Sequence, residues 1–148
     1  MSKVTALFHI VFCTHFRRHT LPLDLREDVY RFIWNVVKQN NSRLVRIGGF
    51  SNHIHLLVDL HPGTRLTDLV RDIKAFTSKW LKRDSRFNQF EGWAKEYFAE
   101  SVSVSSKDSV IGYINNQLEH HKEKDFDEEL REIFKGANLP FDDRDLMA

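Results

Sequence analysis

The order of strand-like and helical hydrophobic patterns is the feature of this sequence that most restricts its fold. The segment 4–13, VTALFHIVFC, is rich in β-branched and aromatic residues over the length of a strand. Over 24–40 the apolar residues instead recur at helical spacing, and a second apolar stripe of this kind covers 66–81. Between these helices, two shorter apolar runs at 44–47 and 53–60 are expected to pair as antiparallel strands.

Three further segments complete the series. The run 97–103 has the composition of a strand, and 106–124 is predicted as one continuous helix with Ser105 or Ser106 as its N-terminal cap. A last short helix is expected over 126–134. A β-α-β-β-α-β order followed by helices predicts an α+β fold of the ferredoxin-like type, in which helices pack on one face of an antiparallel sheet and extra helices follow at the C-terminus.

Length and composition predict a single domain over 1–148, with a core of about 4–135 and a polar C-terminal tail. No apolar run approaches the length of a membrane span and the N-terminus lacks the profile of a signal peptide, so we expect a cytoplasmic protein. The single cysteine, Cys13, excludes an internal disulfide and a multi-thiolate metal site. A net charge of +1 neither requires nor excludes a nucleic-acid partner.

The tripeptide His53-Ile54-His55 is the strongest chemical signal in the chain. It leads directly into the apolar run Leu56-Leu57-Val58, which indicates the start of a buried strand. Side chains two residues apart on a strand point to the same face, so both imidazoles can bind one divalent ion. Because such pairs also arise by chance, a partner elsewhere in the chain must support the metal site.

The predicted helix 106–124 supplies that partner. At helical spacing, Tyr113, Gln117 and His120 form one polar stripe beside the apolar face. A phenol with a pKa of about 10 is a weak nucleophile, but it can attack phosphorus when a metal neutralises the phosphodiester. Gln117 could give its carbonyl oxygen to the ion. His120 is an alternative third ligand, and a third imidazole would favour Mn²⁺, Zn²⁺ or Ni²⁺.

Several short motifs, taken in order, resemble one known family. The sequence resembles the small single-tyrosine HUH transposases of bacterial insertion sequences, including the tyrosine transposases associated with repetitive extragenic palindromes (REP), over about 4–135. The motifs are Phe8-His9-Ile10-Val11, Asn52-His53-Ile54-His55-Leu56-Leu57-Val58, Tyr97-Phe98, Ser101-Val102-Ser103, Tyr113-Ile114-Asn115-Asn116-Gln117 and His120-His121.

The resemblance implies a function, a set of site residues and a partner. Such transposases cut and rejoin single-stranded DNA beside imperfect hairpins at element ends. By this resemblance Tyr113 is the nucleophile that forms a 5′-phosphotyrosine link, and His53, His55 and Gln117 are the ligands of a catalytic Mg²⁺ or Mn²⁺. The resemblance also implies a homodimer, in which the tyrosine helix of one protomer can complete the metal site of the other in trans. One departure is Asn52, where many members have Asp.

Two groups of basic residues are candidates for DNA binding. Arg17 and Arg18 lie in the first loop, and Arg71, Lys74 and Lys82 form a stripe on the helix 66–81. Either group could also be a solvated surface, and a DNA substrate favours the binding interpretation.

The acidic residues from 125 to 132 are interpreted as solvated helix charges. Three other hypotheses for the whole chain stay open at this point. The first is a catalytically silent protein that binds hairpin DNA, the second is a cupin-like metal enzyme with a His-x-His motif, and the third is an interaction module in which the histidines merely pack. The helical stripes at 25–36 and 66–81 speak against the cupin fold.

Overall fold

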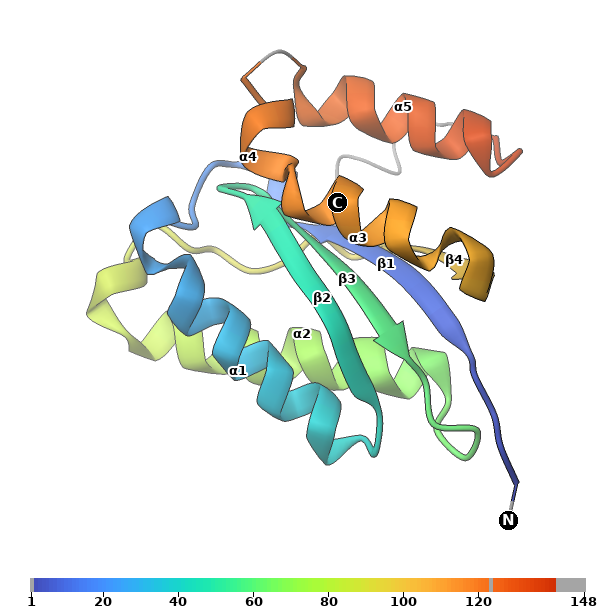
Figure 1. Ribbon diagram of the computed structural model, residues 1–148. Helices are drawn as coiled ribbons and strands as arrows, with labels where there is room; N and C mark the ends of the chain where they lie inside the picture. Colours follow the sequence, from blue (N-terminus) through green and yellow to red (C-terminus); the bar gives the residue numbers. More distant parts are fainter. Residues whose placement is uncertain (1, 123, 141–148) are drawn as a thin grey trace.

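The protein forms a sheet with helices on both of its faces in the computed structural model, which describes residues 2–122 and 124–140 (Figure 1). The strands are β1 (Leu7–Cys13), β2 (Arg43–Phe50), β3 (His53–Asp59) and β4 (Phe98–Val102), and the helices are α1 (Arg26–Gln39), α2 (Leu66–Arg83), α3 (Lys107–Asn115), α4 (Gln117–His120) and α5 (Phe126–Gly136). The part of the predicted polar tail beyond residue 140 lies outside the described residues.

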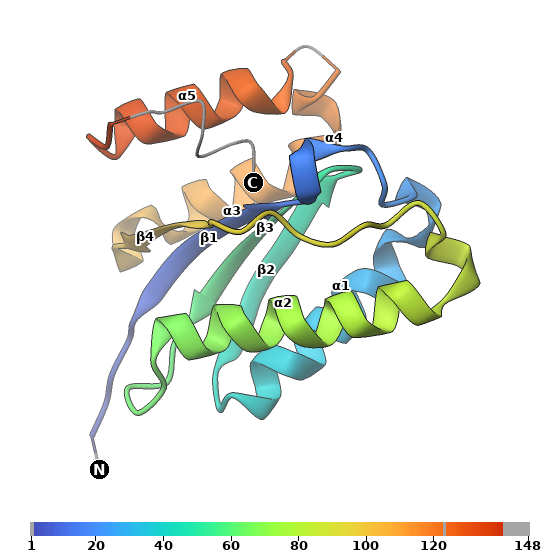
Figure 2. The ribbon, with the colours of Figure 1, turned by 180° about the vertical axis from the view of Figure 1, so that it is seen from behind.

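The four strands form one antiparallel sheet in the order β2-β3-β1-β4. Helices α1 and α2 lie together on one face, and α3, α4 and α5 lie over the other (Figures 1 and 2). This arrangement confirms the predicted α+β fold, with the ferredoxin-like helix pair on one face and additional C-terminal helices. None of the described helices is long and apolar enough to cross a membrane.

The main core lies between the sheet and the pair α1 and α2. Alternate residues of the two central strands, including Ile10 and Leu56, point into this layer and are fully buried, and Ile33 of α1 and Ile73 of α2 meet them there. Full burial of each such side chain contributes about 1.5–3 kcal/mol to folding, so this layer supplies a rigid support for the sheet.

The opposite face of the sheet carries the polar residues. His53 and His55 point to this side from β3, and His9 joins them from the adjacent strand β1. A smaller apolar cluster that includes Leu57 and Ile114 packs α3 against the same face. The site therefore lies between the sheet, whose other face packs against α1 and α2, and the three C-terminal helices α3, α4 and α5.

The predicted continuous helix 106–124 is wrong in one respect, because the chain leaves helical geometry at Asn116. There φ is −96° and ψ is 12°, α3 ends at the residue before, and α4 begins at the residue after. Asparagine side chains compete for backbone hydrogen bonds and favour helix ends, and two of them adjoin at 115–116. The predicted single helix is therefore two short helices, and Gln117 and His120 of α4 still lie near Tyr113 and Glu129.

Helix α5 begins where a side chain satisfies its first free amide. The Asp125 carboxylate accepts a hydrogen bond of 2.9 Å from the Glu128 backbone N–H, which is an N-cap of the usual kind. Phe126 and Leu130 then bury the inward face of the helix against β1 and β4. This docking brings the C-terminal helix over the polar face of the sheet (Figure 2).

Candidate active site

Both histidines of β3 are held with the same ring nitrogen turned inward. His53 and His55 are each 0% exposed. Nδ1 of His53 lies 2.8 Å from Oδ1 of Asn52, and Nδ1 of His55 lies 2.9 Å from Nε2 of His9. Because each Nδ1 is engaged by a neighbour, each Nε2 faces the space between the sheet and the helices. The predicted shared face of this pair is confirmed.

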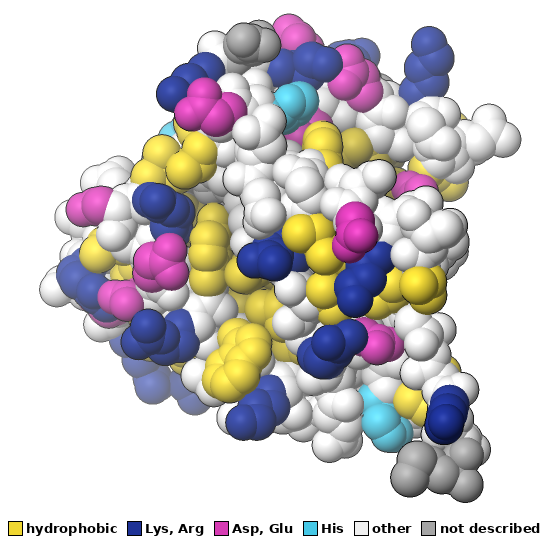
Figure 3. All heavy atoms as spheres, viewed as in Figure 1, with side chains coloured by type: hydrophobic (Ala, Val, Ile, Leu, Met, Phe, Trp, Pro, Cys, Tyr) yellow, Lys and Arg dark blue, Asp and Glu magenta, His cyan; other side chains and the backbone are white. Residues whose placement is uncertain are grey.

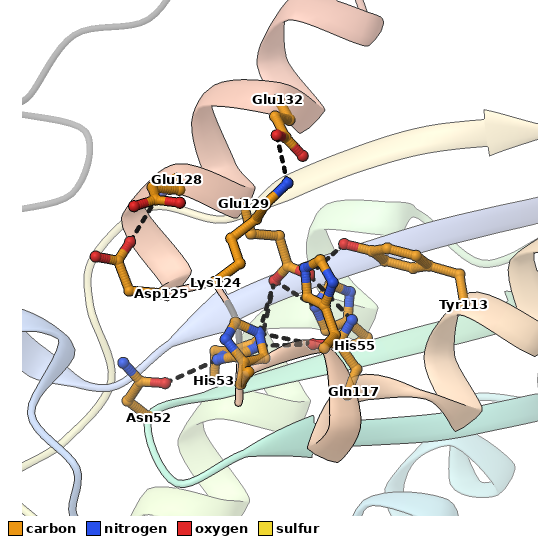
Figure 4. A network of polar contacts seen from close by, with 12 residues as sticks. Asn52, His53, His55, Tyr113, Gln117, Lys124, Asp125, Glu128, Glu129 and Glu132 are labelled. Carbon is orange, nitrogen blue, oxygen red and sulfur yellow. Dashed lines mark hydrogen bonds and ion pairs between the residues drawn. The ribbon is translucent and has the colours of Figure 1, made fainter.

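Helices α3 and α4 bring the predicted partners to this space. Oε1 of Gln117 lies 2.9 Å from Nε2 of His53, and the Tyr113 ring stands edge-on to His55 with ring centroids 5.6 Å apart. The residues predicted to act together, His53, His55, Gln117 and Tyr113, thus form one cluster within a single chain (Figure 4).

Glu129 of α5 occupies the centre of the cluster, and sequence reasoning missed it. Its Oε1 lies 3.2 Å from Nε2 of His55 and 3.4 Å from Nε2 of His53. Its Oε2 accepts hydrogen bonds from the Tyr113 hydroxyl and, at 3.0 Å, from Nε2 of Gln117 (Figure 4). The carboxylate therefore links Tyr113 to the strand imidazoles.

The interpretation of residues 125–132 as solvated charges is therefore wrong for Glu129, which is only 1% exposed. The sequence did contain a signal for it. Glu129 shares the apolar stripe of α5 with Phe126, Leu130 and Ile133, at the spacing that marks a buried helix face. A lone carboxylate on such a face requires a buried polar partner.

His121, which was not proposed as a ligand, lies closer to the two strand histidines than His120 does. Nε2 of His121 is 3.1 Å from Oε1 of Gln117 and 3.3 Å from Oε1 of Glu129. His120 faces the other carboxylate oxygen, and its Nε2 lies 3.0 Å from Oε2 of Glu129. Among the described residues, this nitrogen has no partner with hydrogen-bond geometry. The chain breaks at Asn116, and both His120 and His121 of the segment that follows reach Glu129.

Burial dominates the electrostatics of the cluster. Burial lowers the pKa of His55 to about 3 and that of His9 to about 4, and it also lowers the pKa of His53. Burial, together with the hydrogen bond to Glu129, raises the pKa of Tyr113 above its usual value. Burial alone would raise the pKa of Glu129, but its polar contacts with the surrounding histidines outweigh burial and lower that pKa. The environment thus disfavours the charged forms of His9, His53, His55 and Tyr113 and favours the Glu129 carboxylate.

The loop after β1 lies beside the cluster. Arg17 forms an ion pair of 2.9 Å with Asp127 of α5, and its carbonyl accepts a hydrogen bond from Asn52. Arg18 is more exposed and pairs with Glu91. A surface cavity of about 440 Å³ opens here and is lined in part by Arg17, Asn52 and His121. These two predicted DNA-binding residues are therefore near the site.

The predicted basic stripe of α2 lies on the opposite side of the sheet from the histidines (Figure 1). Arg71 pairs with Asp68 and Asp72, and Lys82 is exposed. On the face drawn in Figure 3, Lys and Arg side chains are interspersed with Asp and Glu and form no continuous basic patch.

Lys74 has a different environment from the other residues of that stripe. Its ammonium donates to three backbone carbonyls, at 2.9 Å to Ala94, 3.1 Å to Lys95 and 3.1 Å to Glu96. Desolvation lowers the pKa of this lysine. The contacts indicate that Lys74 fixes the segment before β4.

Comparison with known proteins places this geometry in a family. The family model described as "Transposase IS200 like" matches residues 2–117. The chain is 24% identical over 120 residues to the transposase for insertion sequence element IS200 of Salmonella typhimurium, covering 78% of each chain. It is 21% identical over 121 residues to the ISDra2 transposase TnpA of Deinococcus radiodurans, covering 78% of this chain and 85% of that one.

A solved structure supports the fold independently. The structure of the REP-associated tyrosine transposase bound to a REP hairpin superposes with a TM-score of 0.61 at 15% identity, and the match covers 82% of this chain and 74% of that one. The family match extends over most of the chain and includes the two strand histidines, the tyrosine and Gln117. The chain therefore belongs to the IS200-like transposase family.

Proposed function

We propose that this protein is a metal-dependent transposase that cleaves and rejoins single-stranded DNA at hairpin-bearing element ends through a 5′-phosphotyrosine intermediate at Tyr113. The observation that carries the proposal is the convergence of the Tyr113 hydroxyl with the inward donor atoms of His53, His55 and Gln117 in one buried cluster. A nucleophile beside a set of metal-ligand atoms is the arrangement that phosphoryl transfer requires.

The polar contacts of His53 support a divalent ion. The Asn52 amide donates through Nδ2 to the Arg17 carbonyl, so its oxygen faces Nδ1 of His53 and accepts the ring proton. A neutral imidazole has one N–H, so Nε2 of His53 then directs a lone pair at Oε1 of Gln117. Two lone pairs 2.9 Å apart repel each other unless a cation lies between them. The residues therefore fit Mg²⁺ or Mn²⁺.

The proposed chemistry follows from the position of the phenol. The Tyr113 oxygen attacks phosphorus, the bond from phosphorus to the 3′-oxygen breaks, and the departing 3′-oxygen takes a proton from water to leave as a 3′-hydroxyl. Oε2 of Glu129 already accepts the phenolic hydrogen bond and is placed to receive that proton. A bound divalent ion would offset the charge of the phosphodiester. Because the tyrosyl ester retains the energy of the cut bond, a 3′-hydroxyl can rejoin the strands without ATP.

We infer that DNA approaches from the loop after β1. Arg17 and Arg18 lie there beside the cavity that adjoins Asn52 and His121, whereas the α2 stripe faces away across the sheet. Within this chain Tyr113 lies in cis with the strand histidines. A homodimer that exchanges tyrosine helices stays a prediction, and mixing Tyr113→Phe with His53→Ala protein would test it, since only trans assembly restores activity.

The decisive experiment is to incubate the protein with labelled single-stranded hairpin DNA and Mn²⁺ and to look for a covalent adduct on a denaturing gel. We expect an adduct with wild-type protein and with Tyr97→Phe, which removes a phenol outside the cluster, and none with Tyr113→Phe. An adduct that persists in Tyr113→Phe, or that forms equally on duplex DNA, would refute the proposal. Hairpin binding without any adduct would instead support the catalytically silent alternative.

A further inference from the structure

The Glu129 carboxylate is a buried charge whose basic partners are imidazoles. It approaches His53, His55, His120 and His121 within 3.0–3.4 Å. Burying a carboxylate among neutral groups is unfavourable unless a cation compensates it. Glu129 also lies twelve residues beyond Gln117, where the family match ends, so the common features of the family do not account for it.

The distances among the donor atoms match the edges of a metal coordination shell. Oε1 of Glu129 lies 3.2 Å from Nε2 of His55 and 3.4 Å from Nε2 of His53, and Oε1 of Gln117 lies 2.9 Å from Nε2 of His53. An ion with bonds of about 2.1 Å in octahedral geometry places neighbouring ligand atoms about 3.0 Å apart. The ligand atoms of His53, His55 and Glu129 also lie within 4.8 Å of one another, so these three residues and Gln117 are spaced like ligands of one ion.

We propose that Glu129 binds the same divalent ion as His53, His55 and Gln117, so that the ion fastens helix α5 over the active site of its own chain. The inference rests on the metal dependence proposed above and adds one ligand to it. With two imidazoles, an amide and a carboxylate, the site suits Mn²⁺.

The proposal couples metal binding to the docking of α5. Besides Glu129, apolar contacts of Phe126 and Leu130 and the ion pair between Arg17 and Asp127 hold the helix, and the Phe126 ring stacks on the His53 ring with centroids 3.9 Å apart. The same apolar cluster covers Cys13, the single cysteine of the chain, which is 6% exposed. Chemical modification of Cys13 therefore reports when α5 leaves the sheet.

The first measurement is calorimetric titration of the metal-free full chain with Mn²⁺. We expect Glu129→Gln, which keeps the shape of the side chain, to lower Mn²⁺ affinity about tenfold or more. Glu128→Gln is the matched control, because it removes the same charge from the exposed face of the same helix. Equal Mn²⁺ affinity in wild type and Glu129→Gln would overturn the proposal.

The second measurement is the rate at which maleimide modifies Cys13. At free Mn²⁺ tenfold above its dissociation constant, modification through α5 opening should slow about tenfold in wild type and in Glu128→Gln, and not in Glu129→Gln. Slowing that is equal in wild type and Glu129→Gln, or absent from both, overturns the proposal. If Glu129→Gln does not fold, as judged by circular dichroism, Glu129→Asp serves in its place with the same expectation, because its shorter side chain withdraws the carboxylate from the ion.

The experiments distinguish a failure of the Glu129 metal site from a failure of the proposed transposase function. Tyr113→Phe removes the nucleophile and leaves every proposed ligand, so it should bind Mn²⁺ like wild type. Glu129-dependent Mn²⁺ binding without any DNA adduct would support the metal site and refute the transposase activity. If Glu129→Gln binds Mn²⁺ normally and forms more DNA adduct, the carboxylate occupies the place of the DNA phosphate and is no ligand.

Discussion

Substitution of Gly48 by alanine should displace the tyrosine helix while leaving the strand histidines in place. Gly48 lies on β2, opposite His55 on β3, and α3 crosses close above it. A Cβ atom at this position would lie 2.5 Å from the Ile114 carbonyl oxygen and 2.9 Å from its Cγ2. The residue before Ile114 is the proposed nucleophile, Tyr113.

The magnitude follows from the contact distances. An ordinary contact of a Cβ atom begins near 3.4 Å, so the contact of the added Cβ with the carbonyl oxygen would be about 0.9 Å too short. Backbone cannot yield like a flexible side chain, so α3 must move by a similar amount. Overpacking of this kind costs about 1–3 kcal/mol, and a displacement of about 1 Å in a reacting group can cost on the order of 10²-fold in rate.

The assay combines thermal unfolding with the single-turnover rate of adduct formation on labelled hairpin DNA. We expect Gly48→Ala to lower the melting temperature by about 3 °C for each kcal/mol lost and to slow adduct formation by about 10- to 100-fold.

Gly112→Ala on α3 is the matched control for this prediction. A Cβ atom there meets nothing within 4 Å, and alanine should stabilise the helix by about 1 kcal/mol. A Gly48→Ala protein with wild-type melting temperature and rate would refute the reasoning, and so would an equal loss of rate in Gly112→Ala.

Three further predictions concern single residues. Asn52→Ala should lower Mn²⁺ affinity about tenfold in calorimetry, because Nδ1 of His53 loses the acceptor that orients its ring; unchanged affinity would contradict this. Lys74→Met should destabilise the protein by about 1–3 kcal/mol in urea unfolding, since three carbonyls lose a charged donor, and DNA affinity measured over a salt series should not change. Burial raises the pKa of Cys13 to about 11, so its thiolate forms only at high pH. The rate of Cys13 alkylation should therefore keep rising about tenfold per pH unit beyond pH 9. A plateau of that rate near pH 9 would indicate an ordinary thiol.

The predictable part of the structure is the part that depends on local pattern. Strands and helices followed from the spacing of apolar residues, with boundaries that shifted by a few residues, as where β1 begins at Leu7 rather than at residue 4. The shared face of His53 and His55 followed from the two-residue period of a strand. Gln117 and Tyr113 lie one helical turn apart in the sequence, and Gln117 stays in the cluster with Tyr113 although it follows the break at Asn116.

Local patterns do not predict contacts between residues that lie far apart in the sequence. Lys74 has the spacing of an exposed basic stripe, yet its ammonium binds the carbonyls of residues 94–96, which only the folded chain brings near. His121 reaches the cluster beside His120, and the predicted helix breaks at Asn116 rather than running on to residue 124. A periodic pattern assumes an unbroken helix, so it does not predict the directions of the side chains that follow an irregular residue.

The sequence by itself determined the sheet, the helices, the pair of strand histidines and the tyrosine that faces them, because each depends on a repeat of two or 3.6 residues. The tertiary structure alone decided that Glu129, 74 residues after His55, lies between that pair and Tyr113. The docking of α5 depends on apolar contacts with β1 and β4, and no local repeat encodes which sheet face a distant helix covers. Burial then turned an acidic residue of a charged segment into the centre of the site.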